Sequence, residues 1–425
     1  MEGGKIMKEW LEKNLLRLNV TSTMNRLEGF NRPGYSDKEM EAVQEFIHLA
    51  DSLDMQVQRD KAGNILAVWN PGNSEKSSIA FISHLDTVTN GGGYDGVAGV
   101  LCGLGVIQYL KEKSWIPSRP VTVICAASEE SSRFGVSTIG SKAMAGLLNP
   151  VLQNDLIHLK DSDGTTLEEA VRSQGLDWNN MNLAEQPLEA FHRVVELHIE
   201  QGTKIENARK DIGIVRGIAC PLRLSFVFTG EAGHTGTTPM NKRKDALAAS
   251  APFIQTVAET AKKIESASGE EIVATASTIE CEPNEMNVIP GKVTIGVDIR
   301  SVNDKRKQEA GDILRTSAIE LAKNQNIHLE IETLVNNASV LLSPEVSVEL
   351  QEASVKAGCQ YHSMDSGAGH DIMNIAEKWQ AGLVFIPCRE GKSHVPEEYA
   401  SLEDLYKGVQ VLANYVMIQT GELKA

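Results

Sequence analysis

Residues Ser78–Gly96 read SIAFISHLDTVTNGGGYDG, and this stretch decides the fold. It begins with a short apolar run that ends at His84, continues through a polar cluster and closes in a glycine-rich loop. Val97–Lys113, rich in Ala, Gly and Leu, reads as a helix, and Val121–Ala127 is a second run of the fully buried type. Strands and helices in this order predict an α/β fold, a doubly wound and mostly parallel sheet with helices on both faces.

The segments on either side continue the alternation. Apolar residues at helical spacing predict a helix at about 37–53, with Ser36 as its N-cap. Further strands are expected at 65–69 and 382–386, and further helices at 344–358 and 402–417.

The centre of the chain has a different pattern. Leu222–Thr229 and Val293–Arg300 alternate strictly between apolar and polar residues, which is typical of half-solvated strands. Asp245–Ser266 lies between them and reads as a long helix. We therefore predict an inserted α+β domain, with boundaries at 1–212 and 333–425 for the discontinuous catalytic domain and 213–332 for the insertion.

The composition excludes several classes of protein. The 425 residues include 57 Asp plus Glu against 41 Lys plus Arg, a formal net charge of −16, which argues against nucleic-acid binding. No stretch approaches the roughly 18 consecutive apolar residues of a membrane span, and the first residues lack the apolar core of a signal peptide. The six cysteines are scattered without a C-x-x-C pair, so we expect a reduced, cytoplasmic protein.

Polar clusters follow two of the predicted strands. Ligands bind outside the carboxyl ends of strands in doubly wound sheets, so Ser83–Val88 and Ser128–Phe134 are the first candidates for site residues. The glycine loop also matches G-x-G-x-x-G, the dinucleotide fingerprint. That alternative is disfavoured because Asp95 would face a pyrophosphate and no acidic residue ends a second strand at the required distance.

A metal site accounts for the polar residues better. Three imidazoles and two carboxylates suit borderline divalent ions such as Zn, Mn, Co or Ni, and five side chains can hold two ions that share one carboxylate. The candidate ligands are His84, Asp95, Glu130, His198 and His394.

Two further carboxylates have candidate roles beside these ligands. Asp86 lies two residues after His84 on an extended segment, where it can accept the second N–H of the imidazole. Glu129 is placed to act as general base toward a metal-bound water. The competing interpretation of Glu129 and Glu130 is a solvated surface pair, but the apolar strand before them has no solvated face.

Nine motifs occur in an order that resembles a known family. They are Ser83–Val88, Gly91–Gly96, Glu129–Phe134, His198–Gly202, Gly233–Met240, Asn287–Gly291, Asp298–Arg300, Ser366–Asp371 and Ser393–His394. Together they resemble the hydantoinase/carbamoylase branch of the dinuclear metallo-aminoacylase and peptidase superfamily. This branch includes N-carbamoyl-L-amino acid hydrolases, β-ureidopropionases and allantoate amidohydrolases.

The resemblance implies a role for each matched residue. It implies the five metal ligands named above, with Asp95 bridging two divalent ions and Glu129 as general base. It also implies a lid domain that forms a homodimer and supplies His234 to the substrate carbonyl, and it places Arg300 at the substrate carboxylate. The residues matching substrate contacts are Gln201, Asn287, Arg300, Gly369 and His370.

The implied activity is hydrolysis of a C–N bond in a small carboxylate-bearing ureido substrate, of the N-carbamoyl-L-amino acid or allantoate type. Thr203, Thr235 and Ser131 depart from the residues usual in the family, which leaves the substrate itself open. An N-acyl-amino acid deacylase or small-peptide hydrolase would use the same ligands. A metal-free binding or scaffold protein is the alternative from another class, whereas a serine hydrolase is disfavoured because no G-x-S-x-G is present.

Overall fold

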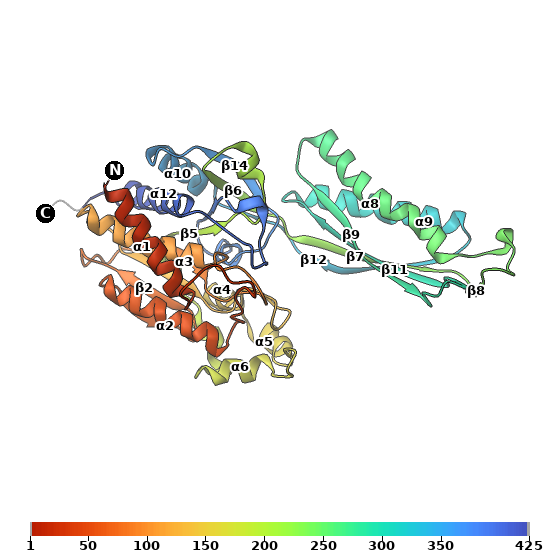
Figure 1. Cartoon of the computed structure of the whole chain (residues 1–425), viewed down its shortest axis with the longest axis horizontal. Helices are drawn as coiled ribbons and strands as arrows, with labels where there is room; N and C mark the ends of the chain where they lie inside the picture. Colours follow the sequence, from red (N-terminus) through yellow and green to blue (C-terminus); the bar gives the residue numbers. More distant parts are fainter. Residues whose placement is uncertain (1, 423–425) are drawn as a thin grey trace. The chain divides into compact units, whose positions relative to one another are not determined.

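The stretch that opens at Ser78 forms strand β3 (Ser78–His84), the loop that follows it, and helix α3 (Val97–Glu112) in a computed structural model that describes residues 2–422 (Figure 1). Every residue of β3 is buried, as expected for a strand covered on both faces. Helix α3 approaches the sheet closely because of its glycines. A Cβ at Gly99 would lie 2.1 Å from the carbonyl oxygen of Leu197, which explains the small-residue composition of this helix.

The first compact unit comprises residues 1–216, 342–364 and 370–425. Its sheet has the order β1-β2-β4-β3-β5-β15-β6, and β14 also pairs with β6. The four central strands β4, β3, β5 and β15 run parallel, and the pairings β1–β2, β2–β4 and β15–β6 are antiparallel, so the prediction of a mostly parallel sheet is confirmed. The other strands of this sheet are β1 (Gln56–Arg59), β2 (Ile65–Trp69), β4 (Val121–Ala126), β5 (Phe191–Ile199), β6 (Ile212–Ile218), β14 (Tyr361–Ser366) and β15 (Ala381–Ile386).

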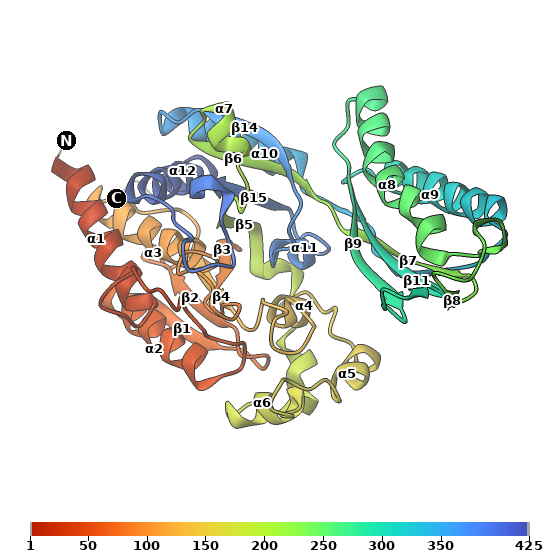
Figure 2. The same ribbon diagram turned by 45° about the vertical axis from the view of Figure 1, so that its right-hand side comes forward.

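Helices cover both faces of this sheet, and each face has its own apolar core. The larger core lies under α1 (Glu2–Leu18), α2 (Asp37–Ser52), α3, α10 (Pro344–Lys356) and α12 (Leu402–Thr420). Figure 2 shows α11 (Ile372–Ile375) and α4 (Ile139–Met144) on the side of the sheet opposite α3. A smaller core is built there with α5 (Pro150–Leu156) and α6 (Leu167–Ser173). The short helix α7 (Lys204–Ala208) follows β5.

The second compact unit comprises residues 217–341 and 365–369, whereas the prediction placed the insertion at 213–332. Its four-stranded antiparallel sheet has the order β12-β7-β11-β9. Alternate residues of β7, such as Phe226 and Phe228, pack against Phe253 of α8, with ring centroids 4.5 and 5.9 Å apart. The elements are β7 (Pro221–Thr229), β8 (Gly233–His234), α8 (Ala246–Ser268), β9 (Val273–Glu282), β10 (Val288–Ile289), β11 (Lys292–Arg300), α9 (Asp304–Asn324), β12 (His328–Asn336) and β13 (Val340–Leu341).

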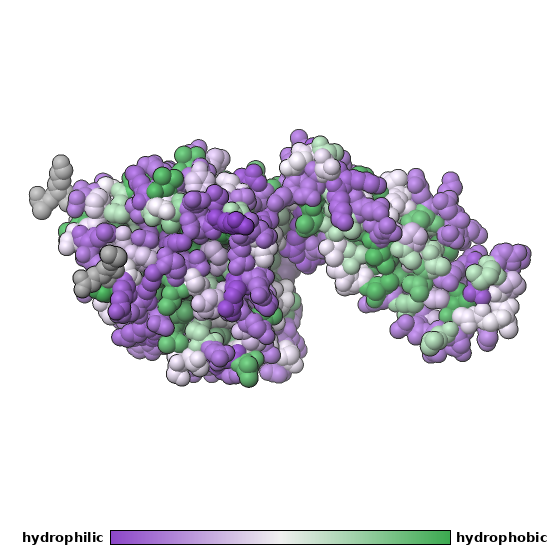
Figure 3. Space-filling model, turned by 45° about the horizontal axis from the view of Figure 1, so that its top comes forward, coloured by the Kyte–Doolittle hydropathy of each residue, from purple (hydrophilic) through white to green (hydrophobic). Residues whose placement is uncertain are grey.

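Hydrophilic residues predominate on the face drawn in Figure 3, and apolar ones form small groups among them. Within residues 2–422, no helix combines the length and the apolarity that crossing a membrane requires.

Candidate active site

Five side chains converge at the carboxyl ends of the parallel strands of the first unit. They are the residues predicted as metal ligands, His84 at the end of β3, Asp95 before α3, Glu130 after β4, His198 on β5 and His394 after β15. They form two groups, His84–Asp95–His198 and Asp95–Glu130–His394, and Asp95 belongs to both. Within each group the possible ligand atoms lie within 4.8 Å of one another.

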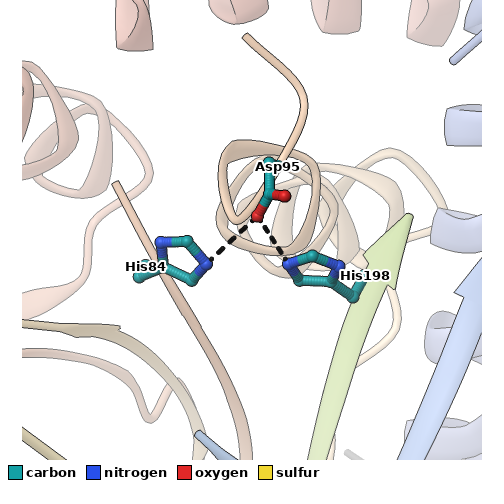
Figure 4. Close-up of side chains that lie close together, drawn as sticks. All are labelled: His84, Asp95 and His198. Carbon is teal, nitrogen blue, oxygen red and sulfur yellow. Dashed lines mark ion pairs between the residues drawn. The ribbon is translucent and has the colours of Figure 1, made fainter. Parts of the chain in front are cut away.

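The two oxygens of Asp95 face different partners. Its Oδ1 lies 3.5 Å from Nε2 of His84 and 3.0 Å from Nε2 of His198 (Figure 4). Its Oδ2 lies 3.3 Å from Nε2 of His394, which in turn is 3.6 Å from Oε1 of Glu130. His84, Asp95 and His198 would form one candidate cation site, and Asp95, Glu130 and His394 a second.

The residues present fit a pair of divalent metal ions. The donors are imidazole nitrogens and carboxylate oxygens, the set that Zn²⁺ and its neighbours accept. Burial opposes the charge on Asp95, which is 4% exposed, but the imidazoles around it hold its pKa well below the usual range. Burial also raises the pKa of Glu130 to about 7, a cost that a bound cation would remove.

Asp86 holds three parts of the site together. Its Oδ1 accepts the backbone N–H of Glu129 at 3.0 Å, and its Oδ2 accepts that of Glu130 at 2.9 Å. The Nδ1 atom of His84 lies 3.0 Å from the backbone oxygen of Asp86 and 3.3 Å from its Oδ1. The predicted contact to the imidazole is therefore shared between the carbonyl and the carboxylate. Ring orientation fixed in this way leaves Nε2 for the metal.

Glu129 is a buried carboxyl group at the edge of the ligand cluster. Its Oε2 lies 3.8 Å from Nε2 of His84, and the residue is 8% exposed. Burial raises its pKa well above the usual value, and Asp371, Glu130 and Asp86 add to the increase while His84 opposes it. Such a group accepts a proton more readily than a solvated carboxylate.

Several backbone positions near the site have a left-handed conformation. The φ angles are +50° at Ser128, +56° at Gln201 and +61° at His394. Conformations of this kind in residues other than glycine gather at functional sites.

Gly96, the last glycine of the loop before α3, lies against a ligand imidazole. Its φ is +66°, and a Cβ there would lie 2.5 Å from the imidazole of His84. Its N–H donates to Nε2 of His198 at 3.1 Å. The glycine of the apparent dinucleotide fingerprint therefore makes room for a ligand imidazole rather than for a phosphate.

Two further hydrogen-bonding groups surround Asp95: Glu398, which was not predicted, and Ser393, from the last of the nine motifs. Glu398 is 5% exposed, and its Oε1 accepts the N–H groups of Tyr94 and Asp95, both at 2.9 Å. Ser393 donates to Asp95 Oδ2 at 2.9 Å and to Glu398 Oε2 at 3.0 Å. Only the position of Glu398 four residues after His394 offered a signal, and a single sequence does not distinguish it from the adjacent Glu397.

Two residues predicted as substrate contacts belong to the first unit and touch ligands there. Gln201 donates from Nε2 to Asp95 Oδ2 at 2.7 Å. The ring of His370 is 2% exposed and packs edge-on to that of His198, with centroids 4.6 Å apart.

The remaining predicted residues belong to the second unit and form two local pairs. His234 lies on β8, is exposed, and is a neighbour of Asn287, whose carbonyl accepts the N–H of Thr235 at 3.1 Å. Arg300 ends β11 and donates to the carbonyl of Gly367 at 2.6 Å, in the segment that also carries Gly369.

Comparison with known proteins identifies the family. The profile of Peptidase family M20/M25/M40 matches residues 80–418, which contain all the predicted ligands. The chain belongs to this family. It is 31% identical to the N-carbamoyl-L-amino-acid amidohydrolase of Paenarthrobacter aurescens, over 96% of this chain and 97% of that one. It is 32% identical to the allantoate amidohydrolase of Escherichia coli K12, over 91% of this chain and 92% of that one.

A solved structure shows the same architecture. An amidase of the hydantoinase/carbamoylase family from Burkholderia multivorans superposes with a TM-score of 0.87 at 28% identity, covering 99% of this chain and 98% of that one. The predicted fold class and family resemblance are confirmed. This chain is a metal-dependent hydrolase of carbon–nitrogen bonds other than peptide bonds.

Replacing Gly96 with alanine tests the fit between the loop and the His84 imidazole. Gly96→Ala forces a Cβ against the ring at a positive φ, so we expect loss of metal from the purified protein together with lower stability. Gly164→Ala is the matched control, because Gly164 has a φ of +85° with nothing within 4 Å of the added Cβ. We expect it to cost about 1–2 kcal/mol and to retain metal. Elemental analysis and thermal unfolding measure both effects; equal metal content in the two variants would contradict this account of Gly96.

Proposed function

We propose that this chain hydrolyses a C–N bond in a small carboxylate-bearing ureido substrate, of the N-carbamoyl-L-amino acid or allantoate type. The main support for the proposal is the cluster of three imidazoles and Glu130 around the carboxylate of Asp95. Glu129 lies beside this cluster. The names of the relatives support the ureido substrate class over N-acyl-amino acids and peptides.

The proposed cofactor is a pair of divalent ions, Zn, Mn, Co or Ni. His84 and His198 would hold one ion and Glu130 and His394 the other, with Asp95 between them. Two such ions, when bound, polarise a carbonyl and bring the pKa of water toward neutral.

Glu129 is the proposed general base. It takes the proton of the attacking water and returns it to the leaving nitrogen, so that the amine departs neutral. The bonds from Asp86 to the adjacent backbone N–H groups fix the position of Glu129 for both transfers. Because burial favours the protonated carboxyl, Glu129 gives up the proton only where a base of sufficient strength, such as the leaving nitrogen, is present.

Arg300 is the proposed partner of the substrate carboxylate. Asp298 accepts hydrogen bonds from its Nε at 2.8 Å and its Nη2 at 3.3 Å, and Gly367 accepts one from Nη1. These bonds orient the planar group, and its remaining N–H donors suit a carboxylate. His234 is proposed to donate to the substrate carbonyl oxygen as negative charge develops there. The other proposed substrate contacts are Gln201, Asn287, Gly369 and His370.

We also propose a cytoplasmic homodimer that forms through the inserted domain. All six cysteines are free thiols, which suits a reducing compartment. Apolar groups appear on the inserted unit in Figure 3, and such groups are typical of protein interfaces. The exposed large apolar side chains include Leu247, Ile254, Val273, Ile279 and Ile319.

Replacing Glu129 with glutamine separates the base from the ligands. We expect Glu129→Gln to lower kcat by about 10²–10⁴-fold, because the amide cannot accept the proton, while metal content stays unchanged. Glu9→Gln, on an exposed helical position, is the control and should match the wild type. Retained turnover in Glu129→Gln would refute the assignment of the base.

A substrate panel tests the reaction class. We expect ammonia release from N-carbamoyl-L-amino acids or allantoate in the presence of Mn, Co, Ni or Zn, and little cleavage of N-acetyl-amino acids or dipeptides. Arg300→Lys should raise KM for the preferred carboxylate substrate about tenfold or more, since lysine lacks the planar fork. Arg315→Lys, on α9, is the control. Faster cleavage of N-acyl-amino acids or dipeptides would assign the chain to a deacylase or peptidase instead.

The oligomeric state tests the proposed dimer. Light scattering should give twice the mass of one chain for the wild type and for the control Ile116→Asp, whose side chain is 42% exposed in the first unit. Ile254→Asp, on α8, should shift the protein toward monomer because a charge replaces an apolar contact. A monomeric wild-type protein would contradict the proposal.

A further inference from the structure

Arg32 is a buried cation of the first unit that the proposed reaction does not use. It is 4% exposed. Its Nε donates to the carbonyl of Leu85 at 2.8 Å, and its backbone N–H donates to Oγ1 of Thr87 at 2.9 Å. The N–H of Thr87 donates back to the carbonyl of Arg32 at 2.9 Å. Arg32 therefore bonds to both neighbours of Asp86, the carboxylate that holds the Glu129 and Glu130 backbone.

Asn19 extends this contact to the other end of the same loop. Its Oδ1 accepts from Nη1 of Arg32 at 2.9 Å, and its Nδ2 donates to the carbonyl of Gly93 at 2.9 Å. Leu85 follows the ligand His84 directly, and Gly93 lies two residues before the ligand Asp95. One pair of side chains thus fixes both ends of loop 85–95, which joins two candidate metal ligands.

Burial of this guanidinium is costly for a purely structural residue. Its Nη2 is buried and has no hydrogen-bond partner within the described part of the chain. Burial lowers the pKa of Arg32 to about 10, and Asp86 and Glu39 oppose the decrease, so the side chain remains a cation at neutral pH. An apolar side chain at such a place avoids the cost of desolvating a charge. What the guanidinium adds is a fixed position for the Leu85 carbonyl, next to Asp86, and for Asn19, whereas the bonds to Thr87 come from the Arg32 backbone.

We propose that Arg32 is a positioning residue for the metal centre and acts together with Asn19. It keeps Asp86 in the orientation that fixes the His84 ring and the Glu129–Glu130 backbone, and it keeps Asp95 close to His84 and His198. The inference rests on the metal ligands of the proposed function.

Metal binding to the full-length, metal-stripped chain tests the inference. We expect Arg32→Met to weaken Mn²⁺ and Zn²⁺ binding, measured by calorimetry, by about 10- to 100-fold, the effect typical of groups that orient metal ligands. Arg32→Lys keeps the charge without the planar fork and should recover part of the loss. Asn19→Ser removes the link to Gly93 and should act in the same direction, which keeps the test decisive if Arg32→Met does not fold.

Amide hydrogen exchange of the metal-free chain gives a readout that does not depend on metal. Peptides covering loop 85–95 should exchange faster in Arg32→Met than in the wild type. Arg193→Met is the matched control, because Arg193 is a half-buried arginine that pairs with Glu349 near the start of β5, at the opposite end of this strand from His198. We expect it to lower Tm and to leave both metal affinity and loop exchange unchanged.

The outcomes distinguish failure of the positioning role of Arg32 from failure of the proposed function. Wild-type metal affinity and loop exchange in Arg32→Met would overturn the positioning role, and so would an equal loss of affinity in Arg193→Met. A wild-type chain that binds no divalent metal would instead refute the proposed function, whatever the variants do.

Discussion

The structure of the site depends on one buried carboxylate, Asp95, whose oxygens face two separate sets of nitrogen and oxygen donors. Burial disfavours the charged form of several acids in the interior of this unit. It raises the pKa of Glu39 and Glu196 to about 8 and that of Glu398 to about 7. Buried carboxyl groups are stable either in the protonated form or beside cations that compensate their charge. The imidazoles and Arg32 supply cationic charge in this interior, and bound divalent metal would add to it.

Sheet topology determines which residues can meet at Asp95. The strands β4, β3, β5 and β15 are adjacent and parallel, so their carboxyl ends lie at the same edge and deliver side chains from four distant parts of the sequence. Ligands on strand ends are held by the backbone ladder of the sheet. Asp95 lies instead in a glycine-rich segment, whose conformational freedom must be removed by other contacts. The bonds from Glu398, Ser393 and the Arg32–Asn19 pair meet this need.

The elements that could be predicted from the sequence are those with a distinct local pattern of apolar and polar residues. Buried strands such as β2 and β3 appear as apolar runs, and alternation identified β7 and β11 to within one residue. The candidate ligands were recognisable because imidazoles and carboxylates followed such runs. Helix α1 was not predicted, and neither were the short helices α4 to α6, whose apolar stripes are too brief for a period to be assigned.

The groups that support the ligands were beyond prediction for a different reason. Glu398 and Asn19 act on backbone N–H and C=O groups that are 303 and 74 residues away along the chain, and such groups occur at nearly every residue. A side chain that bonds to the backbone therefore requires no particular residue type at the other position, and the sequence contains no sign of the contact. The metal ligands face the opposite constraint, because a metal ion selects its donor atoms by chemical type. The ligands of a metal site can thus be predicted from the sequence, because the metal selects residue types. The contacts that hold those ligands in place can be identified only in the structure.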